Sequence, residues 1–171
     1  MLIVVSPAKS LDFESKLPTK KHSEPRMLDD AEELVEVMAE KSPAEISKMM
    51  NVSEGLGELN HERFQDWERP FTTDNSRPAV LAFTGDVYIG MEPGTFTERD
   101  FTHAQKTVRI LSGLHGVLRP LDLIQPYRLE MGTKLVTERG KNLYDFWGSE
   151  VTELINDDLA ARRSNLVVNL A

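Results

Sequence analysis

The sequence has 171 residues, with 20 lysines and arginines against 28 aspartates and glutamates, giving a formal net charge of −8. A chain of this length predicts one domain whose core needs no disulfide or metal. The absence of cysteine excludes disulfides, thiolate metal sites and a cysteine nucleophile. No apolar stretch approaches the ~20 residues that cross a bilayer, and the start lacks the basic leader of a signal peptide. We therefore expect a cytoplasmic protein that makes no membrane contact.

The acidity is concentrated in one part of the chain. Residues 27–68 have a net charge of −9, whereas residues 1–26 have +2 and residues 69–171 have −1. Residues 109–141 are locally basic. Because local patches steer binding, a polyanion partner is compatible with the sequence, although less expected than for a basic protein.

The N-terminal half predicts one strand, an irregular crossing and three helices. Leu2–Val5 is a β-branched run stopped by Ser6-Pro7, which is typical of a buried strand. Residues 10–26 contain two prolines and no clear period. Helical spacing and serine caps then predict helices over 29–40, from Ser42 through Met50, and from Ser53 to about Phe64.

The C-terminal half predicts further alternation of strands and helices. We expect a buried strand over Pro78–Phe83, a capped helix over Thr97–Leu111, a strand or hairpin arm over Leu129–Thr137, a helix over Leu143–Ala161, and a last buried strand over Leu166–Leu170. This order predicts an α/β fold: a single domain with a mostly buried, mixed or parallel sheet flanked by helices.

The turns that follow the predicted strands are candidate sites, because ligands of open α/β sheets gather at the carboxyl ends of strands. Ser6 and Lys9 can contact a phosphate there, or form a serine–lysine pair; a turn with a solvated lysine is an equal alternative. Asp86 in Thr84-Gly85-Asp86 can hold a hydroxyl, a base edge or a metal. For Asp86 an ordinary Gly-Asp turn is the favoured interpretation.

Residues 109–132 form the densest candidate, because glycines, prolines and arginines repeatedly interrupt the apolar residues. Arginine forks favour phosphate or carboxylate, and Tyr127 offers a face for stacking. The alternative is a structural loop whose arginines pair with the acidic helices. We favour a site, with the candidate phosphate-binding residues Arg109, Ser112, Arg119, Tyr127 and Arg128.

Residues 43–63 are a candidate helix-hairpin-helix, in which Asn51, Ser53, Gly55 and Gly57 would shape the connection that faces a phosphate. A plain pair of helices is about as well supported, and its exposed glutamates argue against tight DNA contact on that face. The four histidines are widely spaced and form no metal pattern. We expect no metal site and no cofactor.

Five segments together resemble one known family. They are Leu-Ile-Val-Val-Ser-Pro-Ala-Lys at 2–9, Phe-Thr-Gly-Asp-Val-Tyr at 83–88, Leu-Ser-Gly-Leu-His-Gly-Val-Leu-Arg-Pro-Leu-Asp at 111–122, Gln-Pro-Tyr-Arg-Leu-Glu-Met-Gly at 125–132 and Asn-Leu-Tyr-Asp-Phe-Trp at 142–147. The chain closely resembles the bacterial YaaA family of peroxide stress proteins over its whole length. We expect one domain over residues 1–171, corresponding to about the first two thirds of a family member and lacking its C-terminal part.

The resemblance implies a cytoplasmic protein made under hydrogen peroxide stress and associated with lower free intracellular iron. It further implies an α/β fold with a helix-hairpin-helix and a basic cleft, similar to proteins that bind double-stranded DNA. By position, the implied cleft residues are Lys9, Arg109, Arg119, Tyr127 and Arg128. This chain departs from the family at His115, where tyrosine is usual, and at Thr84, where lysine or asparagine is frequent.

Three functional hypotheses follow. The leading one is a stress-response protein that binds double-stranded DNA, in which replacing Arg119 and Arg128 by alanine weakens duplex binding. The alternative is an enzyme acting on a nucleotide or nucleoside, with Asp86 or Glu130 as the acid/base. Direct iron sequestration has the least support, because the acidic residues of 27–68 fit solvated helix faces better than a gathered ligand set. The sequence predicts no oligomeric state.

Overall fold

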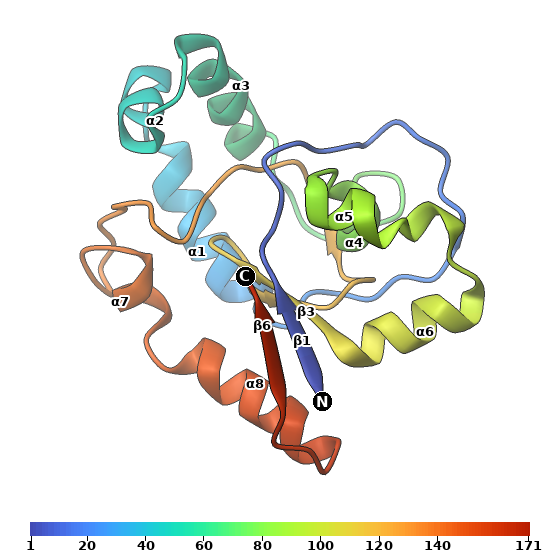
Figure 1. Ribbon diagram of the computed structural model, residues 1–171. Helices are drawn as coiled ribbons and strands as arrows, with labels where there is room; N and C mark the ends of the chain where they lie inside the picture. Colours follow the sequence, from blue (N-terminus) through green and yellow to red (C-terminus); the bar gives the residue numbers. More distant parts are fainter.

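The computed structural model describes residues 1–171 and has a four-stranded mixed sheet with helices on both sides (Figure 1). The strand order is β4-β3-β1-β6. β1 (Leu2–Val5) pairs in parallel with β3 (Val108–Ser112) and with β6 (Val167–Leu170), while β4 (Gly116–Leu118) runs antiparallel to β3. The predicted α/β class with a mixed sheet is therefore confirmed.

The three N-terminal helices lie where their local signals predict them. They are α1 (Leu28–Ala39), α2 (Pro43–Met50) and α3 (Glu54–Gln65). Ser42 and Glu45 form a complete capping box at the start of α2, and the Ser53 hydroxyl accepts a hydrogen bond from the Leu56 N–H at the start of α3. The helices pack together and against the sheet through fully buried apolar side chains, among them Leu34, Met38, Ile46 and Phe64.

The strand predicted over Pro78–Phe83 is wrong. The structure has only a two-residue strand, β2 (Arg77–Pro78), which pairs antiparallel with β5 (Leu123–Ile124), and the chain then turns into the short helix α4 (Ala79–Ala82). Every side chain of α4 is buried. A short apolar run that is buried on all sides has no period, so hydrophobicity alone does not separate a helical turn from a strand.

Of two long predicted helices, one is shorter than expected and the other is divided into two. The helix from Thr97 ends at Thr107, so α6 spans Glu98–Thr107 and the following residues enter β3. The helix predicted over Leu143–Ala161 is two helices, α7 (Leu143–Trp147) and α8 (Glu150–Ala161), separated at Gly148, where φ is +47°. Two further short helices, α5 (Asp86–Met91) and the 3-10 helix η1 (Pro93–Thr95), lie between α4 and α6.

Two other strand predictions need correction. Residues 129–137 form no strand and instead run as a loop that passes α1, below α2 in the view of Figure 1, on its way to α7. The last strand exists as β6, but it is not buried, since Leu166 is 56% exposed and Leu170 is 61% exposed. No helix combines the length and the apolar character needed to span a bilayer.

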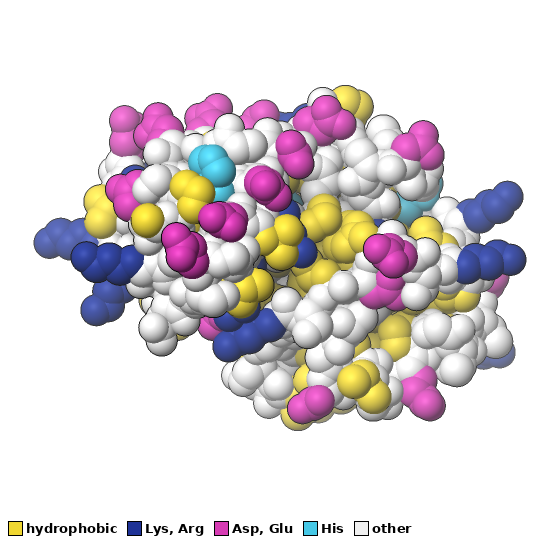
Figure 2. All heavy atoms as spheres, turned by 90° about the horizontal axis from the view of Figure 1, so that it is seen from above, with side chains coloured by type: hydrophobic (Ala, Val, Ile, Leu, Met, Phe, Trp, Pro, Cys, Tyr) yellow, Lys and Arg dark blue, Asp and Glu magenta, His cyan; other side chains and the backbone are white.

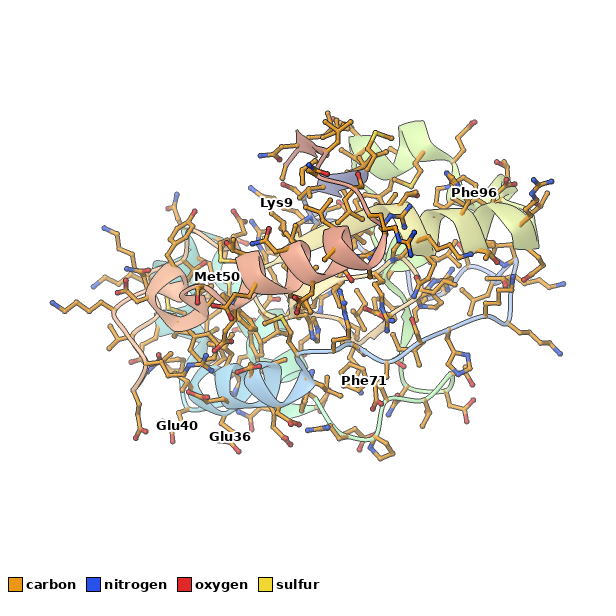
Figure 3. The ribbon with its side chains drawn as sticks, turned by 90° about the horizontal axis from the view of Figure 1, so that it is seen from below. Lys9, Glu36, Glu40, Met50, Phe71 and Phe96 are labelled. Carbon is orange, nitrogen blue, oxygen red and sulfur yellow. The ribbon has the colours of Figure 1, made fainter.

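The acidic face of α1 is partly neutralised by arginines from distant segments. Arg69 lies 2.7 Å from Asp29 and 2.9 Å from Glu32. Arg139 contacts Asp30, Glu33 and Glu150, and stacks on the ring of Phe146 at 4.1 Å. Glu36 on this helix and Glu40, the residue that caps its end, project away from the body of the protein (Figure 3).

Candidate functional site

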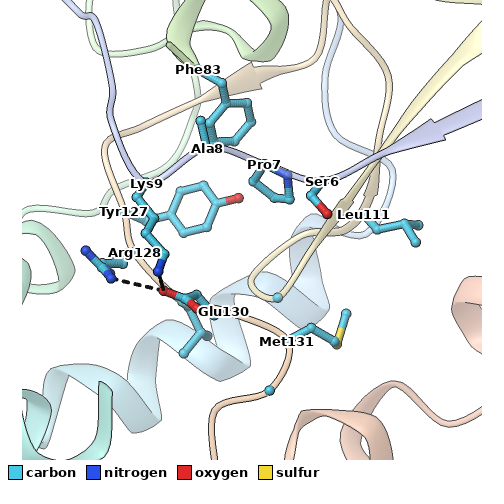
Figure 4. Close-up of a pocket in the computed structure, with 13 residues that line it drawn as sticks. Ser6, Pro7, Ala8, Lys9, Phe83, Leu111, Tyr127, Arg128, Glu130 and Met131 are labelled. Carbon is cyan, nitrogen blue, oxygen red and sulfur yellow. Dashed lines mark hydrogen bonds and ion pairs between the residues drawn. The ribbon is translucent and has the colours of Figure 1, made fainter. Parts of the chain in front are cut away.

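A pocket of about 290 Å³ opens at the carboxyl end of β1. It is lined by two segments, residues 6–9 and 127–132, together with Phe83, Leu111 and Gly113 (Figure 4). This is the sheet edge at which the sequence predicts ligand binding. Its volume lies at the lower end of the range of about 300–1,000 Å³ that is typical of small-molecule sites.

Close backbone packing fixes the walls of this pocket. Ser6-Pro7 ends β1, and the Tyr88 hydroxyl donates a hydrogen bond of 2.9 Å to the Ser6 carbonyl oxygen. On the opposite side, Gly113 lies so close to the Leu129 carbonyl that a Cβ at this position would overlap its oxygen. The turn between β3 and β4 therefore rests directly on the segment that carries the pocket's charged groups.

A buried hydroxyl pair holds the aromatic wall in place. The Ser112 Oγ lies 2.6 Å from the Tyr127 Oη and accepts hydrogen bonds from the N–H groups of Leu114 and His115. With both its lone pairs occupied, the serine hydroxyl donates to the tyrosine oxygen. Burial raises the pKa of Tyr127, so the phenol stays neutral. Its own hydrogen is then free to be donated to another acceptor.

The rim of the pocket carries one carboxylate between two cations. Glu130 lies 3.5 Å from the Lys9 ammonium and accepts a hydrogen bond of 3.0 Å from Arg128 (Figure 4). The side chains of Lys9 and Glu130 are 68% and 53% exposed, whereas that of Arg128 is 16% exposed. The Nε of Arg128 is buried and has no hydrogen-bond partner. This arrangement leaves net positive charge and an unused donor beside the cavity.

The structure does not bring every predicted residue to this pocket. Arg109 is buried on β3, where its Nε donates to Asp158 at 2.6 Å. The guanidinium of Arg119 is bonded to Asp122 and to the Glu24 carbonyl oxygen. Both arginines are therefore paired with acidic side chains, as in the alternative interpretation of residues 109–132, and neither lines the cavity. Ser6, Lys9, Tyr127, Arg128 and Glu130 do line it, and Ser112 supports it from behind.

Asp86 also lies apart from the pocket. It is the exposed first residue of α5 and does not line the cavity. The acid/base candidate that remains at the pocket is Glu130.

The candidate hairpin residues mostly serve the packing of α2 on α3. Asn51 ends α2 in the left-handed conformation with φ of 52°, and Ser53 caps α3. A Cβ at Gly57 would overlap the Ser47 Oγ and lie 2.6 Å from the Pro43 carbonyl oxygen, so glycine is needed for this close approach. Gly55 faces open space. The structure therefore has the predicted pair of helices, and its contact with a phosphate stays a prediction.

A second hollow adjoins the pocket, and the sequence did not predict it. It is lined by Lys41 and Lys48 near or on α2, by Lys134, and by Glu45, Met49 and Gly132; we call it the lysine groove. Gly132 lines both hollows, so the two meet there. The Ser42 hydroxyl and N–H donate to the Glu45 carboxylate and hold its pKa below the usual range.

Figure 2 looks down on this edge of the sheet. It shows a central hollow floored by hydrophobic side chains, with basic groups beside it and many acidic groups around the face. No three or more histidine or acidic side chains lie close enough together to hold a metal ion.

Fold and site define an α/β protein with a small ligand pocket at its strand ends and a cationic groove beside it. The sequence model of the family described as peroxide stress protein YaaA matches residues 1–171, and the chain belongs to this family. It is 56% identical to a UPF0246 protein of Alcanivorax borkumensis, 54% to one of Saccharophagus degradans and 55% to one of Idiomarina loihiensis, each over all 171 residues. The chain spans 66%, 67% and 66% of the lengths of these relatives.

Proposed function

We propose that this protein acts in the cytoplasmic response to peroxide by binding double-stranded DNA along the lysine groove. The observation that carries the proposal is that Lys41, Lys48 and Lys134 converge on one hollow and that none of them is ion-paired to a carboxylate. Unpaired lysines on a concave surface are suited to phosphate oxygens, because each contact releases condensed counterions from DNA.

The pair of helices contributes to this surface through its basic side chains. Lys48 lies in the last turn of α2, and Lys41 lies directly before it. The N-terminus of α3 is a poorer phosphate site, because Glu54 occupies its first turn and repels an anion. We therefore assign DNA contact to α2 and to residue 134, with Lys9 and Arg128 in the adjoining pocket.

The proposal includes the lower free iron that the family resemblance implies. We place this effect downstream of DNA binding rather than in iron storage, since the acidic groups of α1 are largely engaged by Arg69 and Arg139. Equilibrium dialysis against ferrous iron checks this step. Tight, stoichiometric binding would contradict it.

A second candidate function is supported by the position of Glu130. This carboxylate lies at the rim of the pocket between Lys9 and Arg128. The same arrangement suits an enzyme acting on a nucleotide, with the cations on its phosphate and Glu130 as the acid/base. Turnover of a panel of nucleotides by the wild type but not by Glu130→Gln would establish this function instead.

Fluorescence anisotropy of a labelled duplex across a salt series tests the DNA proposal. We expect the triple variant Lys41→Gln, Lys48→Gln and Lys134→Gln to bind more weakly, with its logarithmic salt slope reduced by about one unit for each lost contact. The matched control is Lys16→Gln, Lys20→Gln and Lys141→Gln, which removes the same charge from exposed lysines outside the groove.

A loss of affinity that is equal in the two triple variants would overturn the assignment to the lysine groove, because it would reflect net charge alone. Absence of binding by the wild type would overturn the proposal for this chain. The relative from Alcanivorax borkumensis, measured in parallel, then tells whether binding requires the rest of the family's length.

A further inference from the structure

The pocket and the lysine groove differ in depth and chemistry. The groove is open and bordered by lysines, whereas the pocket is smaller, more enclosed and walled by Tyr127 and Phe83. A duplex is far too large for a cavity of about 290 Å³, while a single nucleoside belongs to its size class. A DNA-binding protein with such a cavity has room for one nucleotide outside the helix.

The polar groups of the pocket match the edge of a base. The Glu130 carboxylate is an acceptor suited to the exocyclic amine of cytosine or adenine. The Tyr127 hydroxyl retains a hydrogen to donate, because its oxygen already receives the hydrogen of Ser112. Lys9 and the Arg128 guanidinium, on either side of Glu130, are further donors at the rim of the pocket. An acceptor flanked by donors in the pocket complements a base edge on which a donor is flanked by acceptors.

The walls provide apolar surfaces for a planar ring. Tyr127 is held on one side by the edge of Phe83, with ring centroids 6.3 Å apart, and on the other by His115 at 5.2 Å. Met131 and Leu111 line the opposite part of the cavity (Figure 4). A base can stack on the rigid aromatic wall, and the flexible thioether of Met131 can adapt to either a purine or a pyrimidine.

The junction at Gly132 connects this pocket with the groove. Gly132 lines both hollows, and a Cβ at this position would meet no atom within 4 Å, so no side chain of residue 132 separates them. Backbone phosphates on Lys48 and Lys134 would leave one nucleotide facing Lys9 and the pocket mouth. We propose that the pocket receives a single base extruded from the duplex that the lysine groove holds. This inference rests on the proposed DNA binding.

The experiment uses a duplex with a central 2-aminopurine, whose fluorescence rises when it leaves the base stack. We compare the wild type with Met131→Trp, which fills the pocket, and with the matched control Met91→Trp, at a half-buried methionine that lines a groove between β1 and α6. Anisotropy on the same samples reports duplex binding independently. Glu130→Gln is the milder second variant, since its side chain is half exposed and its replacement leaves the cavity in place.

We expect binding of the wild type and of Met91→Trp to raise the 2-aminopurine fluorescence above that of the free duplex, because the base leaves the stack. The rise disappears in Met131→Trp and is reduced in Glu130→Gln, although both still bind the duplex. A bound wild type without a rise, or a rise that persists in Met131→Trp and Glu130→Gln, overturns the inference and leaves DNA binding standing. If the wild type does not bind the duplex, the proposed function fails and the inference falls with it.

Discussion

The carboxylate of Asp158 on α8 accepts a hydrogen bond of 2.6 Å from the Nε of Arg109 on β3. Arg26 binds the same carboxylate with two hydrogen bonds of 2.9 Å. This cluster ties the helix that precedes β6 to the central sheet and to the irregular crossing of residues 10–26. An arginine that the sequence assigned to a binding cleft thus serves the fold.

This cluster predicts that the free energy of unfolding decreases at low pH. Burial acts to raise the pKa of Asp158, but the hydrogen bonds from Arg26 and Arg109 outweigh it and hold the pKa at about 2. A depressed folded-state pKa contributes stability that is present above pH 4 and is lost as the pH falls from 4 to 2. We expect Asp158→Asn to cost about 3 kcal/mol at pH 7, because it leaves Arg109 buried without its anion.

Urea unfolding at pH 7, 4 and 3 measures this prediction. The difference in unfolding free energy between wild type and Asp158→Asn should narrow by about 1 kcal/mol between pH 7 and pH 3. The neighbouring exposed carboxylate provides the control, and Asp157→Asn should stay within about 0.5 kcal/mol of the wild type. A gap that is constant with pH would contradict the assignment.

The hydroxyl pair behind the pocket predicts unequal costs for its two members. Tyr127→Phe removes one hydrogen bond and should cost about 1 kcal/mol. Ser112→Ala also leaves the N–H groups of Leu114 and His115 without an acceptor, so it should cost about 2–3 kcal/mol. Denaturant midpoints in the same buffer compare the two variants. Equal costs would show that the backbone finds another acceptor, for example a water molecule.

Elements whose signals are local could be predicted from the sequence. The start of α2 is encoded by Ser42, Pro43 and Glu45, three residues that interact within one helical turn. The end of α6 is different, because Val108 leaves the helix to pair with Ile3, more than a hundred residues earlier in the chain. Such a boundary is set by the sheet and carries no local stop signal.

The same distinction applies to the site. The rule that ligands bind at strand ends placed Ser6 and Lys9 at the edge where the pocket lies, because it needs only the position of β1. Arg109 instead pairs with Asp158, which lies 49 positions away in the sequence, so no local pattern predicts this ion pair. The lysine groove could not be predicted for a similar reason, because tertiary packing alone brings Lys134 to the same hollow as Lys48.

His115 predicts a second pH dependence of the unfolding free energy, at pH values closer to neutral. Its ring is fully buried without a hydrogen-bond partner, and this burial lowers its pKa to about 3. The unfolded chain takes up a proton near pH 6.5 while the folded one does not, so stability is complete above that pH and falls as the pH is lowered toward 3. From pH 7 to pH 5 the expected loss is about 2 kcal/mol.

His115→Phe should abolish this component while keeping an aromatic ring beside Tyr127 and Phe71. The measurement is the difference in unfolding free energy between variant and wild type at pH 7 and at pH 5. It should shift in favour of the variant by about 2 kcal/mol. His22→Phe, at an exposed histidine, is the control, and a similar shift there would refute the explanation.

Two glycines of α3 predict opposite effects of one substitution. Gly55 faces open space in the first turn of the helix, so Gly55→Ala should stabilise the protein by about 0.5 kcal/mol through reduced backbone entropy. Gly57→Ala places a methyl group against the Ser47 Oγ and the Pro43 carbonyl and forces α2 and α3 apart. We expect a cost of about 2 kcal/mol, in the range of overpacked cores.

The double variant Gly57→Ala, Ser47→Ala separates the two contacts. It removes the clash with the serine hydroxyl but leaves the Pro43 carbonyl oxygen 2.6 Å from the new methyl group. Recovery of stability should therefore be partial, because backbone yields less readily than a side chain. Full recovery in urea unfolding would mean that α2 shifts freely on α3. In that case Lys48 would also be free to move, and the lysine groove would not be a preformed surface.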